Sequence, residues 1–196
     1  MSQTLYNRDA IAPVRLPRYT LTAQWLHWLT AACILAVLPL AWLAVNVPPG
    51  PAKGVLFTWH KSFGITIFVL IAARILWRAF HHAPPDTAEP TALTVIARIN
   101  HWLLYAIFIV MPVSGFLLSA WGGRPTSYFF LFTIPALPPN PEASALADRV
   151  HLLGQWMVYA LVGLHLLATA FHVLIRRDYT LERMLPEQDP STVRSP

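Results

Sequence analysis

The chain reads HLLGQWMVYALVGLH from His151 to His165, a hydrophobic stretch with a histidine at each end. Such a stretch forms about four turns of α-helix and rises roughly 21 Å, so the two imidazoles would lie near one face but at different depths. An ionisable side chain is costly inside a membrane, and it usually faces a bundle interior, a cofactor or a proton path. The stretch therefore predicts a membrane helix that presents histidines to two separate sites.

The composition of the whole chain supports a membrane protein. It has 196 residues, of which 56% are hydrophobic and 12% are charged, whereas soluble domains average roughly 25% charged residues. The net charge is +5, but the basic residues flank apolar segments and form no patch mixed with aromatic residues, which argues against nucleic-acid binding. The single cysteine, Cys33, excludes an internal disulfide, a covalently attached c-type haem and an iron–sulfur cluster held by this chain alone.

Four hydrophobic spans divide the chain. Residues 1–20 form a polar arm without the apolar core of a signal peptide, so we expect the first span to be retained. Residues 177–196 form a polar tail, which we expect to be cytoplasmic. The sequence thus predicts an all-α membrane protein, a bundle of four transmembrane helices over residues 21–176. Its spans, each with the roughly 20 apolar residues that cross a bilayer, cover about residues 21–45, 57–80, 93–120 and 146–175.

The basic residues set the expected orientation. Ten of the fourteen lie in the arm, in the tail, or around the link between spans two and three, and four lie in or beside the other two loops. Because positive charge favours the cytoplasmic side, we expect both termini in the cytoplasm. The loop over residues 121–143 on the other side is unusually apolar. We expect it to lie on the outer membrane surface or to cap the bundle.

With this orientation the histidines fall into two layers. His60 and His151 open their spans on the outer side, whereas His27 and His165 lie toward the inner side. Two facing imidazoles from different helices fill both axial positions of a haem iron, which leaves oxygen no open site and makes the centre a one-electron carrier. The pattern predicts two b-type haems, an outer one between His60 and His151 and an inner one between His27 and His165.

Spacing alone leaves the inner pair open. His101, early in the third span, and His172, seven residues after His165, lie at a similar depth, and either can replace an inner ligand. A zinc site matches less well, because no H-E-x-x-H run, cysteine or carboxylate accompanies these histidines. His81 and His82 lie in a polar link, where solvated surface residues are expected.

Small and charged residues accompany the histidines. A glycine makes room for a flat macrocycle or lets two helices approach closely, and both readings fit here. Arg74 lies inside the second span, where a cation is costly without an anion, so we expect a haem propionate or a quinone beside it. Lys61 follows His60 at the outer mouth and is expected to attract an anion. The glycines are Gly64, Gly115, Gly154 and Gly163.

Several short motifs surround the histidines and glycines: QWLHW at 24–28, WHKSFG at 59–64, NHWLLY at 100–105, MPVSG at 111–115, HLLG at 151–154, GLH at 163–165 with His172, and DYTL to MLP at 178–186. Together these motifs resemble the bacterial cytochrome b561 family, four-helix membrane proteins with two haems. The resemblance covers about residues 18–186 and implies a location in the bacterial inner membrane. It also implies the ligand pairs His27 with His165 and His60 with His151, and it leaves His101 and His172 unligated.

The resemblance further implies an activity. The family includes superoxide oxidase, which takes an electron from superoxide at the periplasmic face and passes it through both haems to ubiquinone. We therefore expect a quinone-linked oxidoreductase with superoxide, or another periplasmic one-electron donor, as its substrate. Lys61 would attract the anion, and His172 or His101 would supply protons near the inner haem. The alternative is a membrane anchor and electron conduit for a partner dehydrogenase or hydrogenase, with the apolar outer loop as its docking surface.

Overall fold

Four long helices run the length of the molecule. The computed structural model describes residues 17–84 and 92–187. Within that part the helices are α1 (Leu21–Asn46), α2 (Pro51–Phe80), α3 (Ala92–Trp121) and α4 (Pro141–Phe171), with a short antiparallel hairpin of β1 (Thr126–Tyr128) and β2 (Phe132–Ile134). A π-helical turn, η1 (His172–Arg176), extends α4, and a 3₁₀ turn, η2 (Glu182–Met184), follows it. All four helices are long and apolar enough to cross a membrane, as predicted.

Two helices begin earlier than the hydrophobic spans predict. α2 begins at Pro51 and α4 at Pro141, because proline lacks the N–H that a first helical turn cannot use and already has a helical φ. The Asn140 side chain caps α4 by accepting a hydrogen bond from the Ala143 N–H at 3.0 Å. A hydropathy pattern marks the stretch that faces lipid, whereas the helices continue into polar turns.

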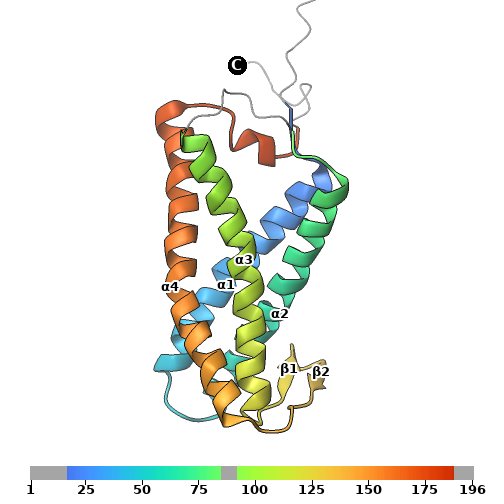
Figure 1. Ribbon diagram of the computed structural model, residues 1–196, viewed down its shortest axis with the longest axis vertical. Coiled ribbons are helices and arrows are strands. Elements are labelled where there is room, and N and C mark those ends of the chain that lie inside the picture. Colours follow the sequence, from blue (N-terminus) through green and yellow to red (C-terminus); the bar gives the residue numbers. More distant parts are fainter. Residues whose placement is uncertain (1–16, 85–91, 188–196) are drawn as a thin grey trace, which may run out of the picture.

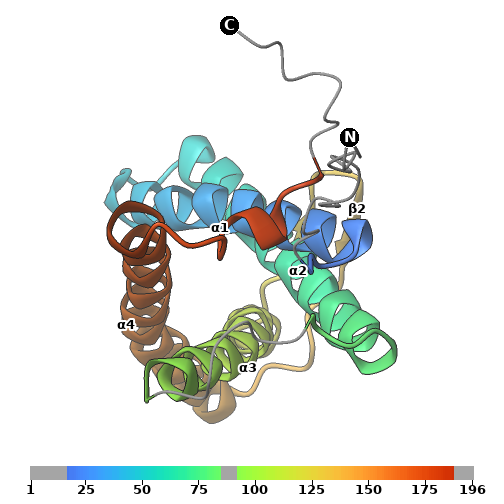
Figure 2. The same cartoon turned by 90° about the horizontal axis from the view of Figure 1, so that it is seen from above.

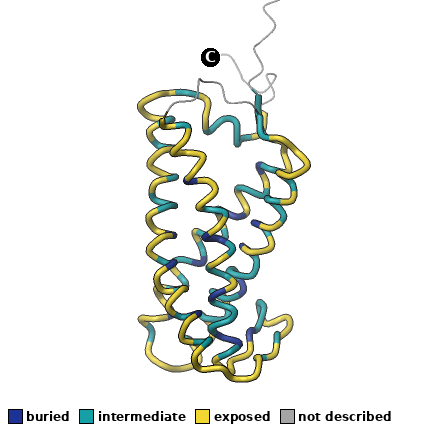
Figure 3. The backbone as a smooth tube through the Cα atoms, in the orientation of Figure 1, coloured by how far each residue is buried: buried dark blue, intermediate teal, exposed yellow. Residues whose placement is uncertain are grey.

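The helices pack as two pairs. α1 lies along α2, α3 lies along α4, and the pairs meet mainly through α2 and α3. Figures 1 and 2 show the four helices arranged around a common axis. The outward faces carry exposed apolar side chains such as Leu35, Trp42 and Leu167, and Figure 3 shows the buried positions on the inward sides. The buried core at mid-height consists of Val37, Ile67, Ile71, Ile107, Phe108 and Val158.

The apolar loop over residues 121–143 contains the hairpin, which the sequence did not predict. Its turn places Phe129 and Phe130 at φ of 46° and 61°, a left-handed conformation that is unfavourable for bulky residues. Contacts with α2 hold the turn: the Phe129 N–H donates to Ser62 Oγ at 2.7 Å, and its ring lies 5.2 Å from that of Trp59. The loop therefore lies against the part of α2 that carries His60. We call this end of the bundle the hairpin end.

The opposite end is crossed by the segment that follows α4. Arg18 Nη1 donates to the carbonyl oxygens of Glu182, Leu185 and Pro186 at 3.1, 2.9 and 3.0 Å, and Trp28 Nε1 donates to that of Met184 at 2.8 Å. Figure 2 shows this red segment running from α4 across to α1. We call this end, with residues 17–20 and 178–187, the terminal end. The rest of the predicted arm, the link over 85–91 and residues 188–196 lie outside the described residues.

Candidate functional site

The hairpin end brings together one predicted histidine pair. The ring centroids of His60 on α2 and His151 on α4 lie 6.3 Å apart, with their planes at 88°. His60 Nδ1 lies 3.2 Å from the Val37 carbonyl oxygen, and His151 Nδ1 lies 3.0 Å from that of Met111. A carbonyl oxygen only accepts, so each Nδ1 carries its proton and each Nε2 keeps a free lone pair, the tautomer that binds a metal.

Residues of α3 surround and orient the His151 ring. Ser114 Oγ lies 3.2 Å from His151 Nδ1 and donates to the Met111 carbonyl. A Cβ on Gly115 would lie 2.9 Å from His151 Cε1, and a Cβ on Gly154 would collide with the Met111 side chain. These two glycines are therefore explained by close packing of α3 against α4.

A second histidine cluster lies at the terminal end. The ring centroids of His27 on α1 and His165 on α4 lie 6.2 Å apart, and the His101 ring on α3 lies 5.6 Å from that of His165. Geometry therefore brings all three imidazoles together and leaves the choice between His27 and His101 open. His27 Nδ1 is buried and has no hydrogen-bond partner within the described residues. No described protein group therefore competes with a ligand for this nitrogen.

Both pairs have dimensions that fit a haem iron. Two metal–imidazole bonds of about 2 Å each, with the distances from the nitrogens to their ring centres, give a centroid separation of about 6 Å. The observed separations are 6.3 and 6.2 Å. A Cβ added to Gly64 or Gly163 would meet no atom within 4 Å, so these two glycines leave room beside the histidines. Val158, midway between His151 and His165 on α4, belongs to the apolar core that separates the two levels.

Charged residues accompany each level. The Arg74 guanidinium carbon lies 5.5 Å from the centre of the Tyr105 ring and interacts electrostatically with His27, His101 and His165. At the hairpin end, Lys61 Nζ donates to Ser119 Oγ and interacts with Arg124. Arg74 and Lys61 thus lie at opposite ends of α2, one beside each histidine level.

His172 lies apart from the other histidines. Its Nδ1 lies 2.6 Å from Asp178 Oδ2 and 3.2 Å from Thr180 Oγ1, so η1 turns it toward the segment that crosses the terminal end. Partial burial on its own raises the pKa of Asp178, but hydrogen bonds from Thr180 and His172 outweigh burial and hold this pKa below its ordinary value of 3.8. A carboxylate in this position fixes the orientation of the imidazole.

Sequence reasoning missed the residues that orient these histidines. Ser114 and the Met111 carbonyl both lie within the MPVSG stretch, and Asp178 begins the DYTL stretch. Each stretch had been noted for its resemblance to a family, but a sequence does not show which histidine a distant hydroxyl, carbonyl or carboxylate contacts.

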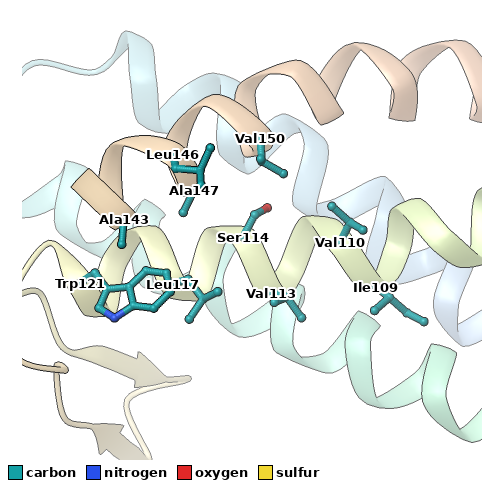
Figure 4. A pocket seen from close by; sticks show the side chains of 10 residues that line it. All are labelled: Ile109, Val110, Val113, Ser114, Leu117, Trp121, Ala143, Leu146, Ala147 and Val150. Atoms are coloured by element: carbon teal, nitrogen blue, oxygen red, sulfur yellow. The ribbon is translucent and has the colours of Figure 1, made fainter. Parts of the chain in front are cut away.

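An apolar cleft borders the hairpin-end pair from the side. It lies between α3 and α4, has a volume of about 410 Å³ and is lined by residues that include Val110, Trp121 and Val150. Figure 4 shows Ser114 on α3 among the side chains that line the cleft. Ser114 also contacts His151, so one of the residues that line the cleft belongs to the surroundings of the histidine pair.

Comparison with known proteins now decides the family. The family model described as prokaryotic cytochrome b561 matches residues 18–187. The chain belongs to this family. It is 31% identical over 176 residues to the probable superoxide oxidase CybB of Yersinia pestis, covering 87% of this chain and 97% of that protein. It is also 29% identical to cytochrome b561 homolog 1 of Escherichia coli K12, covering 87% and 98%.

Membership in the cytochrome b561 family confirms the resemblance expected from the motifs. The chain is a multi-pass membrane protein of the oxidoreductase kind, and the family implies a b-type haem and electron transfer across the membrane. The Escherichia coli cytochrome b561 homolog 2 agrees, at 30% identity over 171 residues.

Proposed function

We propose that this cytochrome holds two b-type haems and carries electrons along α4 from the hairpin end to the terminal end. His60 and His151 would hold one haem, and His27 and His165 the other. The observation that carries this proposal is the pair of imidazole separations, 6.3 and 6.2 Å, at two levels of one helix. When bound between these histidines, each haem would supply one-electron chemistry.

Superoxide is the proposed electron donor at the hairpin end. Two superoxide anions give up one electron each and leave as O₂, and one quinone takes up both electrons and two protons to become a quinol. Lys61, next to His60 in sequence and held by Ser119, supports this choice because a fixed cation draws an anion toward the site. Arg124 adds a second positive charge nearby. The Yersinia relative, which is named a probable superoxide oxidase, supports it further.

Ubiquinone is the proposed acceptor at the terminal end. Its reduction needs protons as well as electrons, and histidine transfers protons near neutral pH. His101 lies beside His165, and His172 is oriented by Asp178. We propose these two histidines as proton donors, with Arg74 holding an anionic group beside them.

The proposed orientation places the terminal end in the cytoplasm of a bacterium and the hairpin end in the periplasm. Arg18, Arg176 and Arg183 gather at the terminal end, as the preference of cytoplasmic surfaces for positive charge requires. The protons for the quinol would then come from the cytoplasm.

A second function is favoured by the tip of the hairpin. Phe130, Leu131 and Phe132 are 58%, 77% and 56% exposed, and an exposed apolar patch marks a contact with lipid or with another protein. The chain would then be the membrane anchor and electron conduit of a partner dehydrogenase or hydrogenase, with this tip as its docking surface.

The two functions are separated by a reduction experiment on purified protein. Superoxide generated by xanthine and xanthine oxidase should reduce the haems, and added ubiquinone should reoxidise them. Superoxide dismutase should abolish the reduction in a parallel sample. A haem band that stays oxidised under superoxide, or that is reduced equally with the dismutase present, would exclude superoxide as the donor. A redox subunit that co-purifies with the chain would then support the conduit.

A further inference from the structure

Two arginines of α2 reach across to α3 near the terminal end. The guanidinium carbon of Arg74 lies 5.5 Å from the centre of the Tyr105 ring, and that of Arg78 lies 5.6 Å from the centre of the Trp102 ring. The arginines are one helical turn apart on α2, and the aromatic residues are one turn apart on α3, so the two contacts are repeated along the same seam. A guanidinium over an aromatic face is held in place without losing its charge.

Neither arginine is paired with a carboxylate of the described residues. Within residues 17–84 and 92–187, the ion pairs join His172 and Arg176 to Asp178, and no Asp or Glu lies within salt-bridge distance of Arg74 or Arg78. The two guanidinium groups repel one another instead, as like charges one turn apart do. Charged side chains in membrane helices are almost always paired or face an aqueous cavity, and the described part of the chain supplies no carboxylate as a counter-charge for these two arginines.

His101 adds a third polar group to the same place. It lies on α3 directly before Trp102, and both Arg74 and Arg78 interact with it electrostatically. Its ring contacts that of His165, which links the arginine pair to the terminal-end histidines. Figure 1 shows α2 and α3 diverging toward this end. The contacts of Arg74 with Tyr105 and of Arg78 with Trp102 connect the two helices there.

We propose that Arg74 and Arg78 together bind one anionic group, a carboxylate or a phosphate, between α2 and α3 at the terminal end. The planar guanidinium matches both groups with paired N–H donors. Two sources offer this chemistry: a propionate of a haem bound at His165, or the headgroup of an anionic phospholipid in the adjoining leaflet. The haem source rests on the proposed function, and the lipid source does not.

The test uses the holoprotein with both arginines replaced, Arg74→Gln with Arg78→Gln. Phospholipid that remains bound after detergent purification is measured by mass spectrometry, and the midpoint potentials of the haems are measured by redox titration. The matched control is Arg176→Gln, which removes a positive charge from the same end but one that already pairs with Asp178. If the double variant does not fold, the exposed Arg78→Gln alone gives the same two readings.

Loss of more than half of the bound anionic phospholipid, with both potentials unchanged, would establish the headgroup as the anion. A lower potential for the terminal-end haem alone, with the lipid content unchanged, would establish the propionate, because an unpaired negative charge favours the oxidised iron. Wild-type lipid content together with unchanged potentials would overturn the proposal. A preparation without haem would defeat the proposed function, yet the lipid measurement would still decide between a headgroup and no anion.

Discussion

Single atoms decide which nitrogen of each histidine is available. At the hairpin end, two backbone carbonyls engage Nδ1 of His60 and His151, which leaves the Nε2 atoms free to bind the proposed haem iron. At the terminal end, His27 Nδ1 has no such partner within the described part of the chain. The two levels therefore differ in how firmly their proposed ligands are oriented, and hydrogen bonds to the far nitrogen of a ligating imidazole tune a metal centre.

Removal of His165 tests the ligand assignment. His165→Ala should lower the haem content of purified protein to about half, because one of two axial pairs is lost while the other keeps both imidazoles. The haem-to-protein ratio and the reduced spectrum measure this. His172→Ala is the matched control and should keep both haems, since its imidazole faces Asp178. Retention of the full haem content in His165→Ala would refute the pairing.

Replacement of Lys61 tests the attraction of an anion. Lys61→Gln should slow haem reduction by superoxide several-fold and weaken its dependence on ionic strength, because the cation acts over a distance. Stopped-flow reduction at two salt concentrations measures both effects. Lys53→Gln is the control: Lys53 lies on the same helix end, where its Nζ donates to the Val47 carbonyl. Equal rates in both variants would remove Lys61 from the donor site.

The Asp178 carboxylate makes the stability of the turn at the terminal end depend on pH. Its pKa lies below the ordinary 3.8, so its bonds to Thr180 and His172 stabilise the turn fully above that value and are lost as the pH falls through the lowered pKa. The protection of residues 178–180 against hydrogen exchange, taken relative to the intrinsic rate at each pH, should therefore change little between pH 7 and pH 5 and decrease below the ordinary carboxyl range. Asp178→Asn should show fast exchange at every pH, and a pH-independent wild type would contradict this.

At the scale of elements, the hairpin depends on a hydroxyl from another helix. The left-handed backbone conformation is unfavourable for Phe129 and Phe130. The Ser62 hydroxyl oxygen stabilises the turn by accepting a hydrogen bond from the Phe129 N–H. The hairpin is thereby attached to α2 two residues beyond His60. A change in the conformation of the turn is thus expected to shift the proposed ligand His60 through the short stretch of α2 that joins it to Ser62.

Loss of this hydroxyl is the test at this scale. Ser62→Ala should destabilise the hairpin by about 1–3 kcal/mol, because it leaves the Phe129 N–H without its partner. Faster amide exchange over residues 126–134 measures the loss. Thr58→Ala is the control, since the Thr58 hydroxyl donates only to the Gly54 carbonyl of its own helix. Equal exchange in both variants would show that the strained turn holds without α2.

The elements differ in how far a sequence determines them. The depth of each histidine follows from its position in a span, since every residue advances a helix by a fixed rise, and the layers of His60 with His151 and of His27 with His165 were reached in this way. The rotation of each helix and its lateral position in the bundle do not follow from the sequence. His101 and His27 are therefore both candidates for the inner ligand opposite His165, and the structure places their rings at similar distances from it. The hairpin escaped prediction because two phenylalanines occupy turn positions that usually take asparagine or glycine.

At the scale of the molecule, both ends of the described chain lie at one end of the bundle. Arg18 and Trp28 near the start of α1 contact residues 182–186, so an even number of crossings returns the chain to the side where it began. Among the described residues, the opposite end carries the connection between α3 and α4, with its hairpin, and the connection between α1 and α2. The proposed orientation assigns these two ends to the cytoplasm and the periplasm.

Cysteine labelling in intact cells tests that orientation. In a Cys33→Ser background, Leu131→Cys should react with a membrane-impermeant maleimide, because Leu131 is exposed at the hairpin tip. Glu187→Cys, at the terminal end, should react only after the membrane is opened. The reverse pattern would invert the molecule and with it the direction of the proposed electron transfer.

The crossing of the terminal end has a bearing on biosynthesis. Residues 178–187 follow α4 in the chain, so a ribosome completes all four helices before it makes the segment that Arg18 fastens. The bundle can insert and gather its histidines while that end is still uncovered, and the fastening comes as a last step. A prosthetic group that arrives from the side of the ribosome would therefore find this end of the bundle uncovered before residues 178–187 are in place and covered afterwards.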